Sequence, residues 1–463
     1  MKKGVILMMA ASLSVTMSSC GLYSKYEPQS EVDETLFGEV GEFSSEAEAN
    51  KATYGDMMWS DIFTDPLLQG YIEQALANNS DLRSAELRVE QAEASMISSR
   101  LAYLPSLSLA PSWSTGGVVS TSDYNYKSYT VPVSCSWEID IFGRITNTKL
   151  RTKMLMEQQR YAAQAVRTEI VAGVANLYYT VTMLKEQLAI AKATELSWGE
   201  SYKAAQAMME SGYMDQTGLS QIEAGLYSVQ MAVESLERDY EAVQNSMCSL
   251  LGIAPQGIES GELSDIETPE TLKVGVPMQM LSSRPDLMAM ESALAASFYS
   301  KNVARSAFYP TISLTGSLGW SNAFGTAILD PAEFIYSFVA QAVQPIFNKG
   351  LNRAQLKIAE ADLQIATIAF EQKLLDSGIE VNDNITAFMT AQSTSALYSA
   401  QVEALERAAK GTQLLMDYGN VTYLEVLTSQ QTLFNAQLGQ VSNRFEQMQS
   451  LVALYKSLGG GRF

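Results

Sequence analysis

The sequence predicts a mainly α-helical protein with a small β part, built from two copies of one helix-strand-strand-helix-helix unit. Three observations predict this fold class. The twelve prolines leave two long proline-free stretches, residues 133–254 and 346–463, in which helices can run without a break. A set of residues recurs at a fixed distance along the chain, and four segments alternate between apolar and polar residues.

The first twenty residues predict export from the cytoplasm. Lys2 and Lys3 precede an apolar stretch over residues 4–15, which ends in Met17-Ser18-Ser19-Cys20. A cysteine directly after two small residues resembles the lipobox of bacterial lipoproteins, in which that cysteine is diacylated and becomes the mature N-terminus. We therefore expect a lipoprotein signal peptide at residues 1–19, lipidation of Cys20 and an acylated N-terminal segment over residues 20–63. The alternative is an ordinary cleaved signal peptide.

The proline-free stretches carry the apolar spacing of long amphipathic helices. In the first stretch, apolar residues are separated by steps of three or four, namely Val166, Ile170, Val174, Leu177, Val181, Leu184 and Leu188. We expect one helix of roughly 68 residues in each half, which would be on the order of 100 Å long. Such helices pack as coiled coils.

An internal duplication organises the chain. Asp81-Leu82 recurs as Asp286-Leu287, and Pro105 recurs as Pro310, both 205 residues further on. In the later part of each half, Gly212 matches Gly419 at a separation of 207. Such a register indicates a repeated structural unit.

The duplication predicts a first repeat over residues 64–254, a linker over 255–282 and a second repeat over 283–463. Each repeat is expected to begin with a helix of about 35 residues, followed by two strands and the long helix. A turn at Gly212 or Gly419 then leads into the last helix.

Four segments predict strands, at about residues 106–114, 128–140, 311–321 and 333–345. They alternate apolar with small or polar residues, and a strand of about 9 to 11 residues can cross an outer membrane when tilted. A half-buried soluble sheet is the alternative. Four strands cannot close a membrane barrel, so a membrane-spanning sheet requires oligomerisation. Two copies would supply 8 strands and three would supply 12, and the strand pattern does not choose between them.

Composition limits the possible functions. The chain has no histidine, which removes the usual general base and the commonest metal ligand, and its net charge of −20 disfavours nucleic acid as a partner. Neither a glycine-rich phosphate loop nor a nucleophile elbow is present. We therefore expect no enzymatic activity, no metal site and no cofactor other than a lipid on Cys20. Cys135 and Cys248 are expected to form no disulfide with each other.

Several motifs resemble one known family. They are Trp137-Glu138-Ile139-Asp140-Ile141-Phe142-Gly143-Arg144, Ser283-Arg284-Pro285-Asp286-Leu287, Pro345-Ile346-Phe347 and Tyr423-Leu424-Glu425-Val426-Leu427. Together with Cys20 and the duplication, they resemble the TolC-like outer-membrane efflux proteins, in the lipoprotein branch that works with RND pumps. The resemblance extends from about Cys20 to Leu458.

The resemblance implies a homotrimer in the bacterial outer membrane. Each chain would give four strands to one 12-stranded β-barrel, and the helices would continue it as a long periplasmic α-helical barrel. The channel would conduct drugs or other small molecules passively, because an inner-membrane pump, of the RND type by this resemblance, supplies the energy. A periplasmic adaptor would dock at the helical tips, at Gly212, Tyr213, Gly419 and Asn420.

The resemblance also places a pore constriction near the second tip. By position, the residues that narrow the pore become Leu424, Glu425 and Thr428, and Asp215 at the first tip is a further acidic candidate. Thr428 departs from the aspartate that is frequent in relatives, which weakens the case for a cation-binding constriction. The alternative for Glu425 is a first-turn carboxylate that is favoured by the helix dipole.

Other functions stay open from the sequence. The chain could be the outer-membrane channel of a type I protein secretion system or of a metal efflux system. It could also be a non-pore structural lipoprotein whose coiled coils bridge periplasmic partners. The sequence does not identify the substrate.

Overall fold

The computed structural model describes residues 23–27, 58–118, 121–263, 284–322, 334–418 and 421–460. The chain divides into two compact units. The sheet unit comprises residues 1–29, 87–161 and 288–372, and the hairpin unit comprises residues 30–86, 162–287 and 373–463. Among the described residues, no helix combines the length and the apolar character needed to cross a membrane.

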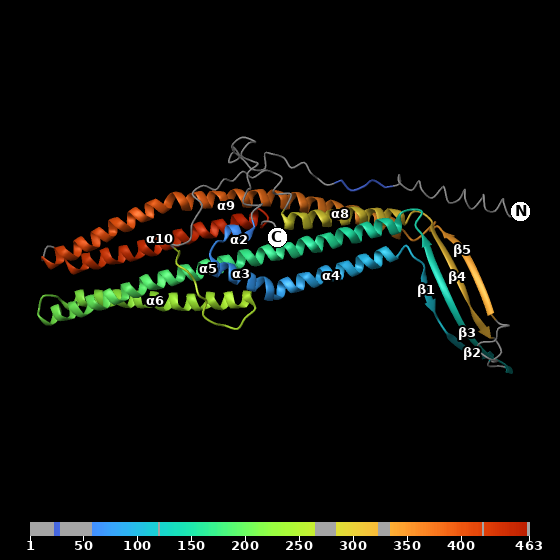
Figure 1. The fold of residues 1–463 in the computed structure, drawn as a ribbon, viewed down its shortest axis with the longest axis horizontal. Coiled ribbons are helices and arrows are strands. Elements are labelled where there is room, and N and C mark those ends of the chain that lie inside the picture. Colours follow the sequence, from blue (N-terminus) through green and yellow to red (C-terminus); the bar gives the residue numbers. More distant parts are fainter. Residues whose placement is uncertain are drawn as a thin grey trace. The chain divides into compact units, whose positions relative to one another are not determined.

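The sheet unit contains one antiparallel sheet. Its strands are β1 (Ser106–Leu109), β2 (Ser112–Val118), β3 (Thr121–Ile139), β4 (Thr311–Asn322) and β5 (Phe334–Val343). Their order is β1-β3-β4-β5, with β2 paired to β3 beyond β1 (Figure 1). The pairing of β3 with β4, from Ile139↔Ile312 to Tyr129↔Asn322, joins the two sequence repeats in one sheet.

The expected strand over residues 106–114 is divided in the structure. β1 ends at Leu109 opposite Val133, and β2 begins at Ser112 opposite Thr130 in the same register. Between them, Pro111 has no N–H to donate to β3, and Pro132 of β3 has none to donate in return. Two prolines on neighbouring strands therefore interrupt the ladder without shifting it.

The motif from Trp137 to Arg144 forms the junction between β3 and the following helix. α5 (Arg144–Glu210) begins there, and the Asp140 carboxylate accepts from the backbone N–H groups of Ile145 (2.8 Å) and Thr146 (2.7 Å). The Arg144 Nε donates to Glu138 Oε1 at 2.8 Å. This motif therefore caps the helix and holds it to the end of β3.

α5 and α6 (Gln216–Leu251) form one antiparallel hairpin, and α9 (Leu351–Asp417) and α10 (Tyr423–Ser457) form another (Figure 1). The first residues of α5 and α9, up to 161 and 372, belong to the sheet unit, and the rest of both hairpins forms the hairpin unit. α5 and α9 have 67 residues each, close to the expected roughly 68. The shorter helices are α2 (Trp59–Ile62), α3 (Pro66–Asn78), α4 (Ser80–Leu101) and α8 (Pro285–Ser306).

The expected first helix of about 35 residues is two helices, α3 and α4, separated at Asn79. The Asn79 Oδ1 accepts from the backbone N–H groups of Asp81 (2.8 Å) and Leu82 (3.1 Å), so the side chain caps α4. The sequence signal for this break is the asparagine between two helical patterns. Asparagine is favoured at helix N-caps and is less favourable inside a continuous helix.

The largest buried core lies in the hairpin unit. It gathers residues of α3, α5, α6 and α10 around fully buried side chains that include Leu68, Ile72, Tyr178, Met247 and Tyr455. The Tyr178 hydroxyl donates to the Asp65 carboxylate and accepts from the backbone N–H of Gly261 at 3.0 Å. Burial and the hydrogen bond to Asp65 raise the pKa of Tyr178.

Candidate functional site

The candidate site is the end of the hairpin unit where α5 turns into α6 and α10 begins. α5 ends in a Schellman motif, in which the N–H of Gly212 donates to Met209 O (3.0 Å) and the N–H of Tyr213 donates to Met208 O (2.9 Å). Gly212 has φ 77°, a left-handed conformation that glycine adopts without a steric penalty. Tyr213 follows with 83% of its surface exposed, so the turn presents an aromatic ring to solvent.

Asp215 begins the second helix of this hairpin. Its Oδ1 accepts from the backbone N–H of Gly218 at 2.8 Å, which makes Asp215 the N-cap of α6. The residue is exposed, and its negative charge lies at the positive end of the α6 dipole. The structure thus gives the Asp215 carboxylate a local stabilising role.

Glu425 has a similar local role at the start of α10. Thr422 is the N-cap residue, and its hydroxyl donates to Glu425 Oε1 at 3.1 Å. The sequence Thr422-x-x-Glu425 has the spacing of a capping box, but the Thr422 side chain makes no capping bond to the helix backbone and contacts the Glu425 side chain instead. The first-turn interpretation of Glu425 therefore has direct structural support.

Leu424 and Thr428 lie on one exposed face of α10. Leu424 is 53% exposed, and the exposed residues Thr428, Thr432 and Asn435 follow it at steps of four, four and three. The Thr428 hydroxyl donates to Leu424 O at 2.8 Å, and the Thr432 hydroxyl donates to Thr428 O at 2.7 Å. Glu425, which is also exposed, borders this face beside Thr432, so the face is polar apart from Leu424 and carries one carboxylate near its start.

The opposite face of α10 packs on the α5–α6 hairpin. Leu427 belongs to a buried cluster with Trp198 and Ala205 of α5 and with Leu219, Ile222 and Val229 of α6. Tyr423 packs against the same cluster, and burial raises the pKa of its hydroxyl. The start of α10 is thereby held to the other hairpin by apolar contacts.

The Trp198 ring of this cluster lies close against Gly225 of α6. A Cβ placed on Gly225 would lie 1.9 Å from Cζ3 of Trp198, so the indole ring occupies the space that any other residue at 225 would need. Glycine at this position is required for close approach of the ring to α6. A glycine within a helical pattern was the only sequence signal of this contact.

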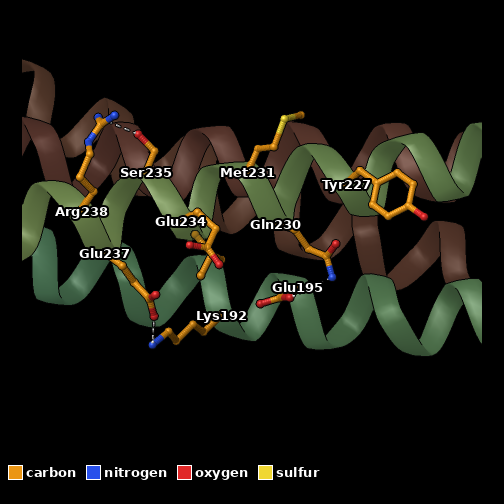
Figure 2. A pocket seen from close by; sticks show the side chains of 10 residues that line it. Lys192, Glu195, Tyr227, Gln230, Met231, Glu234, Ser235, Glu237 and Arg238 are labelled. Atoms are coloured by element: carbon orange, nitrogen blue, oxygen red, sulfur yellow. Dashed lines mark hydrogen bonds and ion pairs between the residues drawn. The ribbon is translucent and has the colours of Figure 1, made fainter.

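A groove of about 990 Å³ runs along the α5–α6 hairpin, and its lining combines polar and charged side chains with the apolar Met231 and Val233 (Figure 2). Lys192 pairs with Glu237 at 2.6 Å, and the Gln230 amide donates to Glu195 Oε1 at 3.2 Å. Arg238 pairs with its neighbour Asp239 at 2.7 Å. Both basic groups of the groove, Lys192 and Arg238, are thus paired with carboxylates of the hairpin itself.

A family model described as outer membrane efflux protein matches residues 71–253 and 276–460. The two matched segments correspond to the two repeats and cover most of the chain. The chain belongs to the outer membrane efflux protein family.

Named relatives of this family span nearly the whole chain. The probable outer membrane lipoprotein SilC of Salmonella typhimurium is 27% identical over 414 residues, which cover 88% of this chain and 89% of SilC. The cation efflux system protein CusC of Escherichia coli K12 is 28% identical over 416 residues, covering 88% and 90%. The crystal structure of the open-state MtrE outer membrane channel of Neisseria gonorrhoeae matches with a TM-score of 0.84 at 25% identity, covering 95% and 98%.

These matches confirm the predicted TolC-like fold class and the predicted family. The structure brings Leu424, Glu425 and Thr428 together at the start of α10. It also brings Met214, next to Asp215, and Tyr423, next to Leu424, onto one apolar cluster. Cys20, Gly419 and Asn420 lie outside the described residues. The roles of all these residues in lipidation, in the pore or in docking stay predictions.

Proposed function

We propose that this chain is the outer-membrane channel of a tripartite efflux system of the RND type. It would provide a passive exit duct for small molecules from the periplasm or the inner-membrane pump to the exterior. Family membership and the similarity to an outer membrane channel over 95% of the chain support this proposal. We assign the chain no catalytic step.

The observation that carries the proposal is the exposure of β5. All ten residues of this edge strand are exposed, including Tyr336 and Phe338 on one face and Ile335 and Val339 on the other. An apolar edge strand with free backbone groups needs a partner strand, in lipid above all. Pairing of β5 with the β1–β2 edge of another copy would continue the sheet, and three copies would give the proposed trimer.

A second apolar surface of the sheet unit supports assembly. On α9, Leu351, Ile358, Ile365 and Ile368 are each about half exposed or more, at steps of seven, seven and three. This spacing is that of a coiled-coil seam, which buries its apolar residues against another helix. Another copy of the chain would cover it.

Trimer formation is tested by gel electrophoresis and by native mass spectrometry of the detergent-extracted protein. The proposal expects a species of three times the mass of the processed, lipid-carrying chain, which begins at Cys20, and heating should convert it to monomer. A monomer alone after correct processing would contradict the trimer and with it the channel.

We further propose that Leu424, Glu425, Thr428 and Asp215 narrow the pore at the periplasmic end. The exposed face of α10 that starts at Leu424 supports this placement. Leu424→Ala and Glu425→Ala are expected to raise basal conductance and the entry of large antibiotics into cells. Leu397→Ala, at an exposed leucine of α9, serves as the control. Unchanged conductance in both gate variants would remove these residues from the role.

The turns at Gly212, Tyr213, Gly419 and Asn420 are the proposed docking surface for a periplasmic adaptor. The exposed ring of Tyr213 supports this, because exposed aromatic residues contribute strongly to binding energy. Tyr213→Ala is expected to weaken capture of the adaptor that is encoded nearest to this gene while trimers persist. Capture at the level of the unmodified protein would contradict docking at this turn.

The proposed location is the outer membrane, with a lipid on Cys20 and a large periplasmic part. Residues 23–27 support a fixed attachment of the N-terminal segment, because the Tyr23 hydroxyl donates to Phe142 O at 3.0 Å within the sheet unit. SilC, a relative, is named as a probable lipoprotein. Cys20→Ala should abolish incorporation of labelled palmitate, and retained labelling would exclude this cysteine as the site.

The cargo we propose is small organic molecules, with metal cations as the second candidate. The name of CusC, a cation efflux protein, favours the second. A strain that lacks this chain should become sensitive either to hydrophobic antibiotics or to salts of metal cations, and the pattern decides between the two cargoes. No observation on the described residues favours protein secretion.

A further inference from the structure

Basic residues gather where the helices of the sheet unit meet one end of its sheet. The pairs Ser106↔Ser136 and Thr311↔Val343 mark this end, and α4, α5, α8 and α9 begin or end a few residues from it (Figure 1). The segments 100–105, 141–155, 300–310 and 344–358 contain ten basic and no acidic residues, although the whole chain has 31 basic and 51 acidic ones. The ten residues, here called the basic belt, are Arg100, Arg144, Lys149, Arg151, Lys153, Lys301, Arg305, Lys349, Arg353 and Lys357.

Most of the basic belt is not neutralised within the sheet unit. Arg144 pairs with Glu138, and the Lys149 Nζ lies 5.3 Å from the centroid of the Tyr103 ring. Asp140, the nearest other acidic residue, already caps α5. Six exposed cations of the belt form no ion pair with any residue that the structure describes, and these are Arg100, Lys153, Arg305, Lys349, Arg353 and Lys357.

Helix stability does not account for the cations near the start of α9. Arg353 and Lys357 lie in the first two turns of this helix, and its first turn holds no acidic residue. Positive charge at this end opposes the helix dipole. Lys349, just before the helix, has φ 48°, a left-handed conformation that is costly for a lysine. Local structure therefore disfavours all three cations, so their charge points to an anion outside the chain.

Large apolar side chains are exposed beside these cations. Ile346 is 97% exposed and Phe347 is 85% exposed, directly before Lys349 in the chain. At the same end of the sheet, Trp137 of β3 is partly exposed and donates from Nε1 to Tyr103 O at 2.8 Å. Aromatic residues together with long basic side chains are typical of a membrane–water interface, where the charged groups extend toward the lipid headgroups.

We propose that the basic belt binds the headgroups of anionic phospholipids in the membrane leaflet that faces the periplasm. Phosphate oxygens would accept hydrogen bonds from Lys349, Arg353 and Lys357, while the acyl chains would lie against Ile346 and Phe347. A cluster of basic residues beside a membrane-spanning segment attracts anionic lipids in this way. The inference rests on the proposed channel function, because it requires the sheet to cross the outer membrane.

The test is a lipid titration of the full-length protein in neutral detergent, measured by native mass spectrometry. The two probes are dioleoylphosphatidylglycerol, which is anionic, and dioleoylphosphatidylcholine, which has the same acyl chains and no net charge. We expect the protein to retain phosphatidylglycerol more strongly, by about fivefold for each cation that contacts a headgroup. This preference should decrease at higher ionic strength, because salt screens exposed charges.

A variant that combines Lys349→Asn, Arg353→Gln and Lys357→Gln removes three charges of the belt. Asparagine tolerates the left-handed conformation of residue 349, so the turn before α9 is kept. The affinity for phosphatidylglycerol should fall by about tenfold or more, and the affinity for phosphatidylcholine should stay the same. Circular dichroism and the trimer band show whether the variant still folds and assembles.

The matched control combines Lys203→Gln, Arg407→Gln and Lys410→Gln, which removes the same charge from exposed positions of the hairpin unit. It should keep the preference for phosphatidylglycerol. Equal retention of the two lipids by the unmodified protein would overturn the proposal. A preference that survives in the belt variant, or that is lost equally in the control, would overturn it as well.

A competition experiment separates a lipid from a soluble anion. Glycerophosphoglycerol is the headgroup of phosphatidylglycerol without acyl chains, and it should displace the lipid poorly. Full displacement at an equal concentration would indicate a site for soluble anions, such as a pore wall, and would contradict lipid binding. Conductance tests the channel separately: conducting trimers without lipid preference contradict the belt alone, whereas a protein that forms neither trimers nor conductance steps contradicts the channel.

Discussion

The two repeats fasten their helices at equivalent positions with different chemistry. In the first repeat, the buried Asn79 side chain donates from Nδ2 to Leu250 O at 3.0 Å, which ties the start of α4 to the end of α6. In the second repeat, Arg284, which is 205 residues further on, donates from Nη1 to Ser457 O at 2.8 Å and ties the start of α8 to the end of α10. Ser457 is 207 residues after Leu250, so the contact itself is duplicated.

The difference lies in what surrounds the donor. Arg284 is 3% exposed and also donates to Asp286 (2.9 Å) and Glu380 (2.8 Å), while Lys373 pairs with Asp286 at 2.8 Å. A buried guanidinium requires such partners, whereas a neutral asparagine does not. The two repeats thus share the geometry of this junction, but only the junction of the second repeat relies on ion pairs.

The largest expected effect comes from removing that charge. Arg284→Met leaves Asp286 and Glu380 without their shared partner. Because the two carboxylates are 32% and 37% exposed and Asp286 keeps Lys373, we expect a loss at the lower end of the about 3–5 kcal/mol for a buried ion pair. Asn79→Leu removes one neutral donor together with its cap and should cost about 1–3 kcal/mol. Apparent melting temperatures in detergent, at one scan rate, compare the two variants.

Arg83→Ala, at an exposed arginine of α4, controls for the loss of a surface charge and should lie close to the unmodified protein. If Asn79→Leu lowered the melting temperature more than Arg284→Met, the ion network would not be what distinguishes the second junction.

The two hairpins also differ in how closely their helices pack at one equivalent position. Gly225 of the first hairpin accommodates Trp198, whereas the position 207 residues later is the exposed Thr432. Gly225→Ala forces the indole ring to move and should cost about 1–3 kcal/mol, because overpacking a well-filled contact strains it. Thr432→Ala should change the melting temperature only slightly. Equal effects of the two changes would contradict a notch that is specific to the first hairpin.

The charged junction should also respond to pH. Burial alone would raise the pKa of Asp286, but hydrogen bonds and charges of Arg284 and Lys373 outweigh it and hold this pKa well below its usual range. A carboxylate with a lowered folded-state pKa stabilises the fold at pH values above its unfolded-state pKa of about 3.9. This stability is lost as the pH falls through the folded value.

Asp286→Asn should therefore destabilise the protein near neutral pH and show a smaller further loss on acidification to about pH 3. Melting temperatures across this interval measure the difference. Parallel pH curves for the variant and the unmodified protein would show that Asp286 does not contribute. Asn79 of the first junction has no titratable side chain, so Asn79→Leu should keep the pH slope of the unmodified protein.

The smallest expected effect concerns the helix caps at the hairpin ends. Asp215 accepts directly from a backbone N–H of α6, whereas the Thr422 hydroxyl contacts Glu425 and no backbone donor. Asp215→Ala should cost about 1 kcal/mol, and Thr422→Ala should cost less. Amide hydrogen exchange is measured in the first turn of α6 in Asp215→Ala and in the first turn of α10 in Thr422→Ala. We expect the larger increase in exchange rate, relative to the unmodified protein, in α6. Faster exchange in α10 alone would reverse the assignment of the stronger cap.

Periodicity in the sequence predicts the parts of the fold that repeat. The spacing of Val166, Ile170 and Val174 predicts α5, and the recurrence of Asp81-Leu82 as Asp286-Leu287 predicts two equivalent helix starts. The interruption at Pro111 could have been predicted, because proline cannot complete a ladder.

Contacts between distant side chains could not be predicted. No local pattern indicates that Arg284 meets Glu380, or that Trp198 rests on Gly225, because these pairs depend on how long helices pack. At the candidate site, the sequence places Leu424, Glu425 and Thr428 near a helix start. It does not separate the capping role of Glu425 from a role in a pore.

Single-channel recording from the purified protein in planar lipid bilayers tests the channel proposal most directly. We expect discrete conductance steps whose size or open probability increases in Leu424→Ala, because that change removes bulk from the proposed constriction. A protein that forms stable trimers in detergent and yet gives no conductance steps, either unmodified or as Leu424→Ala, would contradict the assignment as an exit channel.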